Sequence, residues 1–195
     1  MSDSDLLQKI DAEIALLSPT ELAAELVRIP SHPGIERQEE QVVLALARFR
    51  GERDLGVQLE EILPGRPNLM VSVQGGRPGP HLLFCGHTDT VPLNSGDPGF
   101  GLSGDIRDGR LLGRGSVDMK SAVAAMAVAV VALSRHLPAG RVSFAAVIDE
   151  EMESLGAEQL VDTSFRADGA VVGEPTSNRI ALGHKGLEWL EVHFQ

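Results

Sequence analysis

The sequence predicts an α/β fold with three layers, in which helices cover both faces of a largely parallel sheet. Short apolar, β-branched segments alternate along the chain with segments that carry apolar residues at helical spacing. This alternation is typical of parallel strands joined by crossover helices. The composition, 43% hydrophobic and 23% charged over 195 residues, is sufficient for a buried core.

The first half of the chain predicts three helices and then three strands. The helices are expected at residues 6–17, 19–27 and 36–50, each with apolar residues on one face. The second begins at a capping-box signature, Ser18-Pro19-Thr20-Glu21, with proline at the first helical position. The strands are expected at residues 57–62, 68–73 and 81–85, with a Gly/Pro turn at 75–80.

The second half predicts the part of the sheet that carries most of the acidic groups. Residues 119–136 form a helix that is apolar almost all round, so we expect it to be buried against the sheet. A short helix is expected at residues 154–161. Strands are expected at residues 141–148, 170–172, 180–182 and 187–194.

Charge and cysteine content exclude several classes of protein. A net charge of -11 argues against nucleic acid and anionic membrane as partners, because both require clustered Lys and Arg. Cys85 is the single cysteine, so no disulfide framework is possible and a reducing compartment is expected. The first residues are acidic where a signal peptide would be basic, and no apolar run reaches membrane-spanning length. We therefore expect a cytoplasmic protein.

Four short segments with acidic or histidine side chains follow predicted strands. They are residues 86–92 (GHTDTVP), 113–120 (GRGSVDMK), 149–151 (DEE) and 173–176 (GEPT). Ligands of open α/β sheets bind outside the carboxyl ends of the strands, where these segments fall. One imidazole and several carboxylates at one sheet edge are the groups that a site for two divalent cations requires.

The first two segments also permit structural interpretations. His87 and Asp89 lie two residues apart beyond a strand, so Asp89 could accept a hydrogen bond from one imidazole nitrogen while the other binds metal. The alternative is a strand-end histidine followed by a turn-forming aspartate. Asp118 precedes a predicted helix, and its alternative role is an N-cap.

The last two segments are acidic turns after apolar strands. The three carboxylates of residues 149–151 repel one another unless water or cations neutralise them, so a solvated acidic loop is the alternative to a metal site. Glu174 follows a short strand, and by itself it could be an exposed loop glutamate. Four such segments in one α/β alternation together favour the metal site.

In their order and local sequence, these four segments resemble the M20 metallopeptidases, which include acetylornithine deacetylase, succinyl-diaminopimelate desuccinylase, carboxypeptidase G2-like enzymes and aminoacylases. The resemblance runs from about Leu22 to the last residue. A glutamate at position 174 looks more like the deacetylase and desuccinylase branch. The run of residues 173–177, followed by His184-Lys185-Gly186, also resembles acetylornithine deacetylase-like members.

The resemblance implies a role for each site residue. His87 would bind one zinc ion, Asp118 would bridge two, and Glu151 would bind the second. Glu174 would be a further ligand of the first zinc, Glu150 the general base, and Asp89 the group that orients His87.

The implied reaction is hydrolysis of an amide bond in an N-acyl amino acid or a short peptide. The mixed nitrogen and oxygen ligands suit Zn²⁺, and they also tolerate Co²⁺ or Mn²⁺. Two other classes stay open on the residues alone. A two-metal phosphoesterase also uses carboxylates and histidine, although the sequence has no P-loop and its site is poor in arginine. A non-catalytic metal-binding module would keep the carboxylate cluster without turnover.

Other polar residues are expected to be structural. Cys85 is interpreted as a small buried thiol, and Arg114 and Lys120 as residues that flank the site, for which a substrate-carboxylate role is the less favoured alternative. The remaining histidines lack a carboxylate-rich context and are expected at the surface or in loops; they include His32, His81, His136 and His193.

The resemblance also implies a domain division. Residues 1–184 would form the N-terminal portion of a catalytic metal-binding domain, and 185–195 the first strand of an α+β lid domain. Relatives continue through this lid, through which the intact protein could form a homodimer, and then supply a further metal-binding histidine. The 195-residue chain is therefore expected to be a C-terminally truncated fragment with a weak second metal site and little amidase activity.

Overall fold

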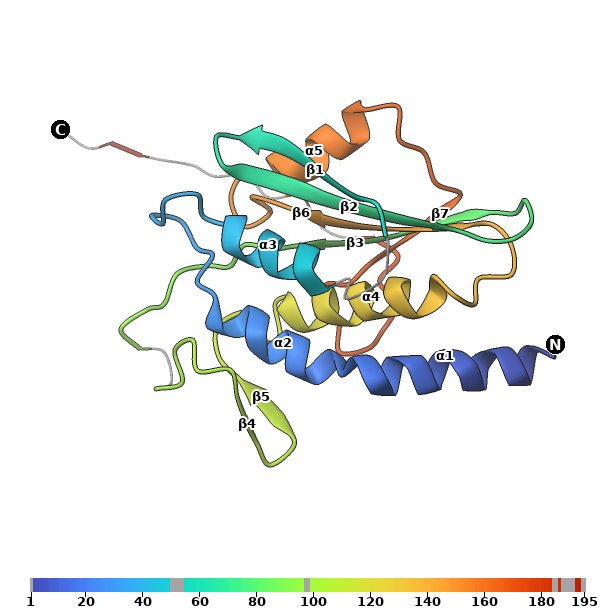
Figure 1. Cartoon of the computed structure of the whole chain (residues 1–195). Coiled ribbons are helices and arrows are strands. Elements are labelled where there is room, and N and C mark those ends of the chain that lie inside the picture. Colours follow the sequence, from blue (N-terminus) through green and yellow to red (C-terminus); the bar gives the residue numbers. More distant parts are fainter. Residues whose placement is uncertain (1, 50–54, 97–98, 184–185, 187–191, 194–195) are drawn as a thin grey trace.

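A computed structural model describes residues 2–49, 55–96, 99–183, 186 and 192–193, and it has the expected three-layer α/β architecture. A five-stranded sheet in the order β1-β2-β6-β3-β7 forms the middle layer. Figure 1 shows α1 to α4 on one side of the sheet and α5 on the other. In the described parts of the chain, no helix is long and apolar enough to cross a membrane.

The elements have the following bounds. The helices are α1 (Asp3–Leu17), α2 (Pro19–Arg28), α3 (Glu40–Phe49), α4 (Lys120–Leu133) and α5 (Leu155–Asp162). The main sheet consists of β1 (Val57–Leu63), β2 (Arg66–Gln74), β3 (His81–His87), β6 (Arg141–Val147) and β7 (Gly169–Val172). A separate hairpin pairs β4 (Asp105–Arg107) with β5 (Arg110–Leu112).

The sheet is mixed, and its parallel part is confined to β6, β3 and β7. Both β1 and β6 pair with β2 in the antiparallel sense. Only residues 64–65 separate β1 from β2, and a connection this short can join only antiparallel strands. The parallel part positions the candidate site, because three of the four acidic segments follow its strands.

Alternate residues of β6 face two different hydrophobic cores. Phe144 and Ala146 pack in the larger core with α4, whereas Ala145 and Val147 pack on the α5 side with Leu83. Helix α4 lies between the sheet and the outer helices α1 and α2. This central position explains why its sequence is apolar almost all round.

Two differences from the expected elements concern helices. Helix α3 begins at Glu40, four residues later than predicted, because Arg37 adopts a left-handed backbone and Glu39 turns into the interior. Ser18 does precede α2, but its own backbone is left-handed and its side chain makes no capping hydrogen bond. The capping-box prediction is therefore wrong at this position.

The other differences concern strands. The β4–β5 hairpin was not predicted, although Asp108-Gly109 at its turn is a strong hairpin signal. Residues 180–182 form no strand, and the side chains of Ile180 and Leu182 project from an irregular, fully exposed segment. The strand expected at 187–194 lies mainly outside the described residues.

Strand register brings three chain segments to one edge of the sheet. His87, the last residue of β3, pairs with Val147, the last residue of β6. On the other side of β3, Cys85 pairs with Val172, the last residue of β7. Because the three strands are parallel, the segments that follow them emerge together.

Candidate metal centre

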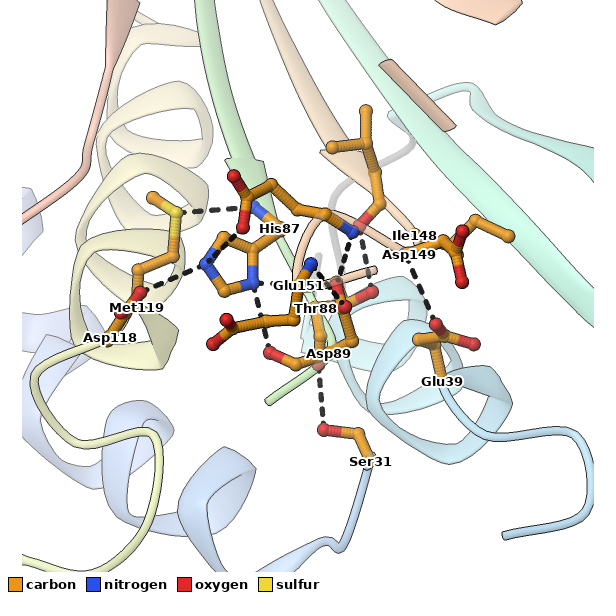
Figure 2. A network of polar contacts seen from close by, with 12 residues as sticks. Ser31, Glu39, His87, Thr88, Asp89, Asp118, Met119, Ile148, Asp149 and Glu151 are labelled. Carbon is orange, nitrogen blue, oxygen red and sulfur yellow. Dashed lines mark hydrogen bonds and ion pairs between the residues drawn. The ribbon is translucent and has the colours of Figure 1, made fainter. Parts of the chain in front are cut away.

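His87 lies at the centre of the acidic cluster. Its side chain is 1% exposed, and its two ring nitrogens face different groups. Nδ1 lies 3.0 Å from the backbone oxygen of Asp89, and Nε2 lies 3.0 Å from Oδ1 of Asp118 (Figure 2). Nε2 also lies 3.8 Å from Glu150 and 3.7 Å from Glu174. One imidazole nitrogen is thus surrounded by three carboxylates from three segments.

Two overlapping groups of side chains have the spacing that a metal ion requires. One group contains His87, Asp118 and Glu151, and the other contains His87, Glu150 and Glu174. Within each group, the candidate ligand atoms all lie within 4.8 Å of one another. A single imidazole with hard carboxylate oxygens fits zinc, and also cobalt or manganese. Glu150 lies as close to the imidazole as Glu174 does, although the resemblance gives it no ligand role.

The electrostatics of His87 are dominated by its acidic surroundings. Burial by itself lowers the pKa of His87, but the hydrogen bond and charge of Asp89 oppose this, and Glu174 and Glu150 add to them. The net effect raises the pKa of His87 to about 10. In the absence of metal, the imidazole is therefore protonated at neutral pH and acts as the cation of the cluster.

Two carboxylates of the cluster have raised pKa values. Burial raises the pKa of Glu174 to about 6, with the charges of Asp118, Glu150 and Glu151 acting in the same direction and His87 opposing them. Burial and the neighbouring Asp118 likewise raise the pKa of Glu151. Such mutual repulsion favours binding of a cation among these carboxylates.

Asp89 connects the histidine to the acidic turn after β6. Its side chain is fully buried, and its two carboxylate oxygens accept the backbone N–H groups of Glu150 and Glu151 at 3.1 and 3.0 Å. Oδ1 is also 3.5 Å from Nδ1 of His87. Although burial opposes its ionisation, its hydrogen bond to His87 lowers the pKa of Asp89, and the two N–H groups contribute.

Asp118 is not a helix cap. Helix α4 has Met119 at its N-cap position and no side-chain capping bond, and the Asp118–Met119 peptide bond is cis. The carboxylate of Asp118 is half exposed and reaches His87. Met119 is buried beneath it, and its sulfur accepts the backbone N–H of His87 at 3.2 Å. The capping alternative is therefore wrong.

Asp149 does not join the cluster, although it is the first of three consecutive carboxylates. Its Oδ1 accepts a hydrogen bond from Nη2 of Arg66 at 2.7 Å, and the same guanidinium binds Glu39 through Nε at 2.7 Å and Nη2 at 2.6 Å. Glu39 is 0% exposed. Sequence analysis missed Glu39 and Arg66, because neither lies in one of the four acidic segments that follow predicted strands.

The flanking polar residues have structural positions. Lys120 is fully buried, its Nζ donates to the backbone oxygen of Ile29 at 2.6 Å, and burial lowers its pKa to about 7. Burial raises the pKa of Cys85 to about 11, which agrees with an unreactive thiol. His81 is more buried than expected and lies at the opposite end of β3, where it contacts Ser143 and the backbone of Arg166.

Curated relatives of similar sequence are desuccinylases by name. The chain is 34% identical over 194 residues to succinyl-diaminopimelate desuccinylase of Parvibaculum lavamentivorans, covering 89% of this chain and 47% of that protein. It is 38% identical over 188 residues to succinyl-diaminopimelate desuccinylase 2 of a Ruegeria species, covering 87% and 45%. The chain thus spans about half the length of the curated relatives it matches.

Solved structures of related fold are peptidases. An M20 family metallo-carboxypeptidase from Sulfolobus solfataricus, Sso-CP2, matches with a TM-score of 0.63 at 18% identity, over 80% of this chain and 37% of that one. Human carnosine dipeptidase 1 matches with a TM-score of 0.60 at 23% identity, over 81% and 37%. At these identities the likeness concerns the fold.

A family profile covers the candidate metal centre itself. The profile of peptidase family M20/M25/M40 matches residues 83–191, which is more than half of the chain. The match contains each of the side chains that surround His87, namely Asp89, Asp118, Glu150, Glu151 and Glu174. On this match and on the sequence identity to the desuccinylases, the chain belongs to peptidase family M20/M25/M40.

Proposed function

We propose that the intact protein hydrolyses an amide bond in an N-acyl amino acid, of the deacetylase or desuccinylase type, or in a short peptide, with two zinc ions at the cluster around His87. The observation that carries this proposal is the convergence of one imidazole and three carboxylates at the ends of three parallel strands with a fourth carboxylate, Asp118, from the start of α4. The desuccinylase names of the relatives favour an N-acyl amino acid over a peptide.

In this proposal His87, Asp118, Glu151 and Glu174 would hold the two ions. The family resemblance would make Asp118 the ligand common to both, whereas the two groups in the structure have His87 in common. The chemistry that zinc supplies in such sites is a lower pKa for a nearby water and polarisation of the scissile carbonyl. Glu150 accepts the proton of that water and passes it to the leaving amine. Its side chain is 43% exposed, so substrate and water can both reach it.

The remaining expectations for the intact protein are part of the same proposal. Residues 1–184 form the catalytic metal-binding portion, and 185–195 begin a lid domain through which two copies could associate. Small molecules are the proposed partners, since a net charge of -11 disfavours nucleic acid and anionic membranes. The single Cys85 favours a reducing, cytoplasmic location.

The experiment that tests the function is hydrolysis by the zinc-loaded intact protein of a panel of N-acetyl amino acids, N-succinyl amino acids and dipeptides. We expect turnover of one of these classes, lost on treatment with a chelator and restored by zinc. Magnesium-dependent release of phosphate from esters would instead indicate a phosphoesterase. Tight metal binding without hydrolysis of any amide would indicate a non-catalytic module.

Metal binding to the cluster should release protons. A histidine ligand must be neutral, but the pKa of His87 in the metal-free protein is raised to about 10. At pH values between the ordinary pKa of histidine and the raised pKa of His87, metal binding must displace the imidazole proton. The metal affinity should therefore rise about tenfold per pH unit in this range. Glu174, with a pKa of about 6, is already ionised near pH 8 and contributes little there.

Calorimetry at about pH 8 in buffers of different ionisation enthalpy measures this release, and we expect about one proton for the site that contains His87. The release should disappear above the raised pKa of His87. His32→Gln is the matched control, because the His32 ring bonds to the backbone oxygen of the neighbouring Pro33 and lies outside both groups of candidate ligands. It should leave the release unchanged. Binding heats that do not depend on the buffer would contradict the protonation state assigned to His87.

Replacing Asp89 should weaken metal binding without unfolding the protein. Asp89→Ala removes the carboxylate beside His87 and frees the N–H groups of Glu150 and Glu151. Groups that orient metal ligands typically contribute about 10–100-fold to affinity, and we expect a loss of this size. Asp168→Ala is the control, since Asp168 accepts a hydrogen bond at the other end of β3. Equal affinities in the two variants would show that Asp89 is only a turn residue.

A further inference from the structure

The turn that follows β6, residues 149–154, is held by two buried carboxylates. Its first backbone N–H, at Asp149, lies 3.3 Å from Oε1 of Glu39, and its next two donate to Asp89. Both carboxylates are 0% exposed. Figure 2 shows Glu39 and Asp89 next to one another, each bonded to the backbone at the start of this turn. Three successive amides are therefore anchored, one of them by a residue outside the metal cluster.

Arg66 holds the outer anchor in place. Its guanidinium makes two hydrogen bonds to Glu39 and one to the carboxylate of Asp149, all of 2.6–2.7 Å. Asp149 has a φ of +66°, a left-handed backbone that is costly for a residue other than glycine. Its contacts with Arg66 and Glu39 stabilise this conformation, which directs the Asp149 side chain away from the cluster while Glu151 faces it (Figure 2).

We propose that Glu39 and Arg66 are positioning residues of the metal centre. They fix the left-handed Asp149 and thereby set where Glu150 and Glu151 stand relative to His87. Neither belongs to the two groups of candidate ligands, so they act only through the turn. This inference rests on the proposed function. It adds that metal affinity depends on a buried Arg–Glu pair that lies behind the ligands.

The test is the zinc affinity of the 195-residue chain and of three variants, measured by competition with a chromophoric chelator. Arg66→Met removes the guanidinium and should weaken zinc binding about 10–100-fold, as loss of a ligand-orienting group does. Glu39→Gln keeps the size and one acceptor oxygen of the side chain, so a smaller loss, about tenfold, is expected. Arg66→Lys keeps the charge but not the two-point contact, and its affinity should fall between those of the parent and Arg66→Met.

Hydrogen exchange of the Glu150 and Glu151 amides, measured without metal, provides a second readout. Exchange of both should accelerate in Arg66→Met and Glu39→Gln, because the turn loses its outer anchor. Val130→Ala is the control for general destabilisation. Val130 is buried in the core and lies ten residues, or about 15 Å, along α4 from Lys120. It should lower stability while leaving zinc affinity and these two amides unchanged.

The outcomes separate this inference from the proposed function. If the parent chain binds zinc and the Arg66 and Glu39 variants bind it equally well, the positioning role is wrong and the metal centre stands. The same conclusion follows if Val130→Ala weakens zinc binding as much as they do. If the parent chain binds no zinc, the positioning role is wrong for this chain, whereas the proposed function fails only if the intact protein binds no zinc either. Should Arg66→Met not fold, Glu39→Gln and Arg66→Lys decide the question by themselves.

Discussion

Glu150→Gln in the intact, zinc-loaded protein should lower kcat by about 10²–10⁴-fold, the usual contribution of general acid–base catalysis. The substitution keeps the size of the side chain but removes its ability to accept a proton. Glu150 lies 3.8 Å from His87 and is 43% exposed, so it can reach both the cluster and a bound water. Metal analysis of the purified variant should still find two ions per chain.

Glu151→Gln is the matched control, because it makes the same chemical change at the next residue. Glu151 is grouped with His87 and Asp118, and its backbone N–H shares the anchor of Glu150 at Asp89. We expect this variant to lose metal, and its activity to recover in part at high zinc concentration. Equal metal loss in both variants would show that Glu150 is a ligand. That result would agree with the second group of candidate ligands, in which Glu150 stands with His87 and Glu174.

The fold could be predicted because its periodic signals agree with its tertiary contacts. Strand β6 is apolar apart from Arg141 and Ser143, since both of its faces are covered. Helix α4 is apolar almost all round, since it lies between the sheet and α1 and α2. The prediction failed where a contact between residues distant in the sequence determines the local structure. Helix α3 starts late because Glu39, at its expected first turn, binds Arg66 from β2. No local pattern in residues 36–40 indicates that contact.

The candidate ligands could be predicted from the order of the acidic segments along the chain. The residues that support those ligands, Glu39 and Arg66, could not. Three of the segments follow the parallel strands β3, β6 and β7, so strand register brings them together, and Asp118 joins them from the start of α4. Without the family resemblance, the residues could not separate Asp149 from Glu150 and Glu151, because three adjacent carboxylates look equivalent until the backbone conformation is known. The left-handed φ of Asp149 and the guanidinium of Arg66 distinguish them, and both depend on how β2 pairs with β6.

Arg66→Met should lower the free energy of unfolding by about 3–5 kcal/mol, the effect expected when one partner of a buried ion pair is removed. The expected loss of stability comes from the two carboxylates that Arg66 leaves behind. Glu39 is 0% exposed and Asp149 is 5% exposed, so two carboxylates would stay buried without their cation. Urea unfolding of the metal-free chain, monitored by circular dichroism, measures the difference.

Arg107→Met is the matched control, since Arg107 also bonds to an aspartate, but the two side chains are 66% and 41% exposed. Exposed pairs contribute about 0–1 kcal/mol, so this variant should be nearly as stable as the parent. Adding Glu39→Gln to Arg66→Met should recover part of the lost stability, because one uncompensated charge is then removed. If the double variant is less stable by the sum of the two single effects, the loss at Arg66 comes from packing of its side chain and not from stranded charge.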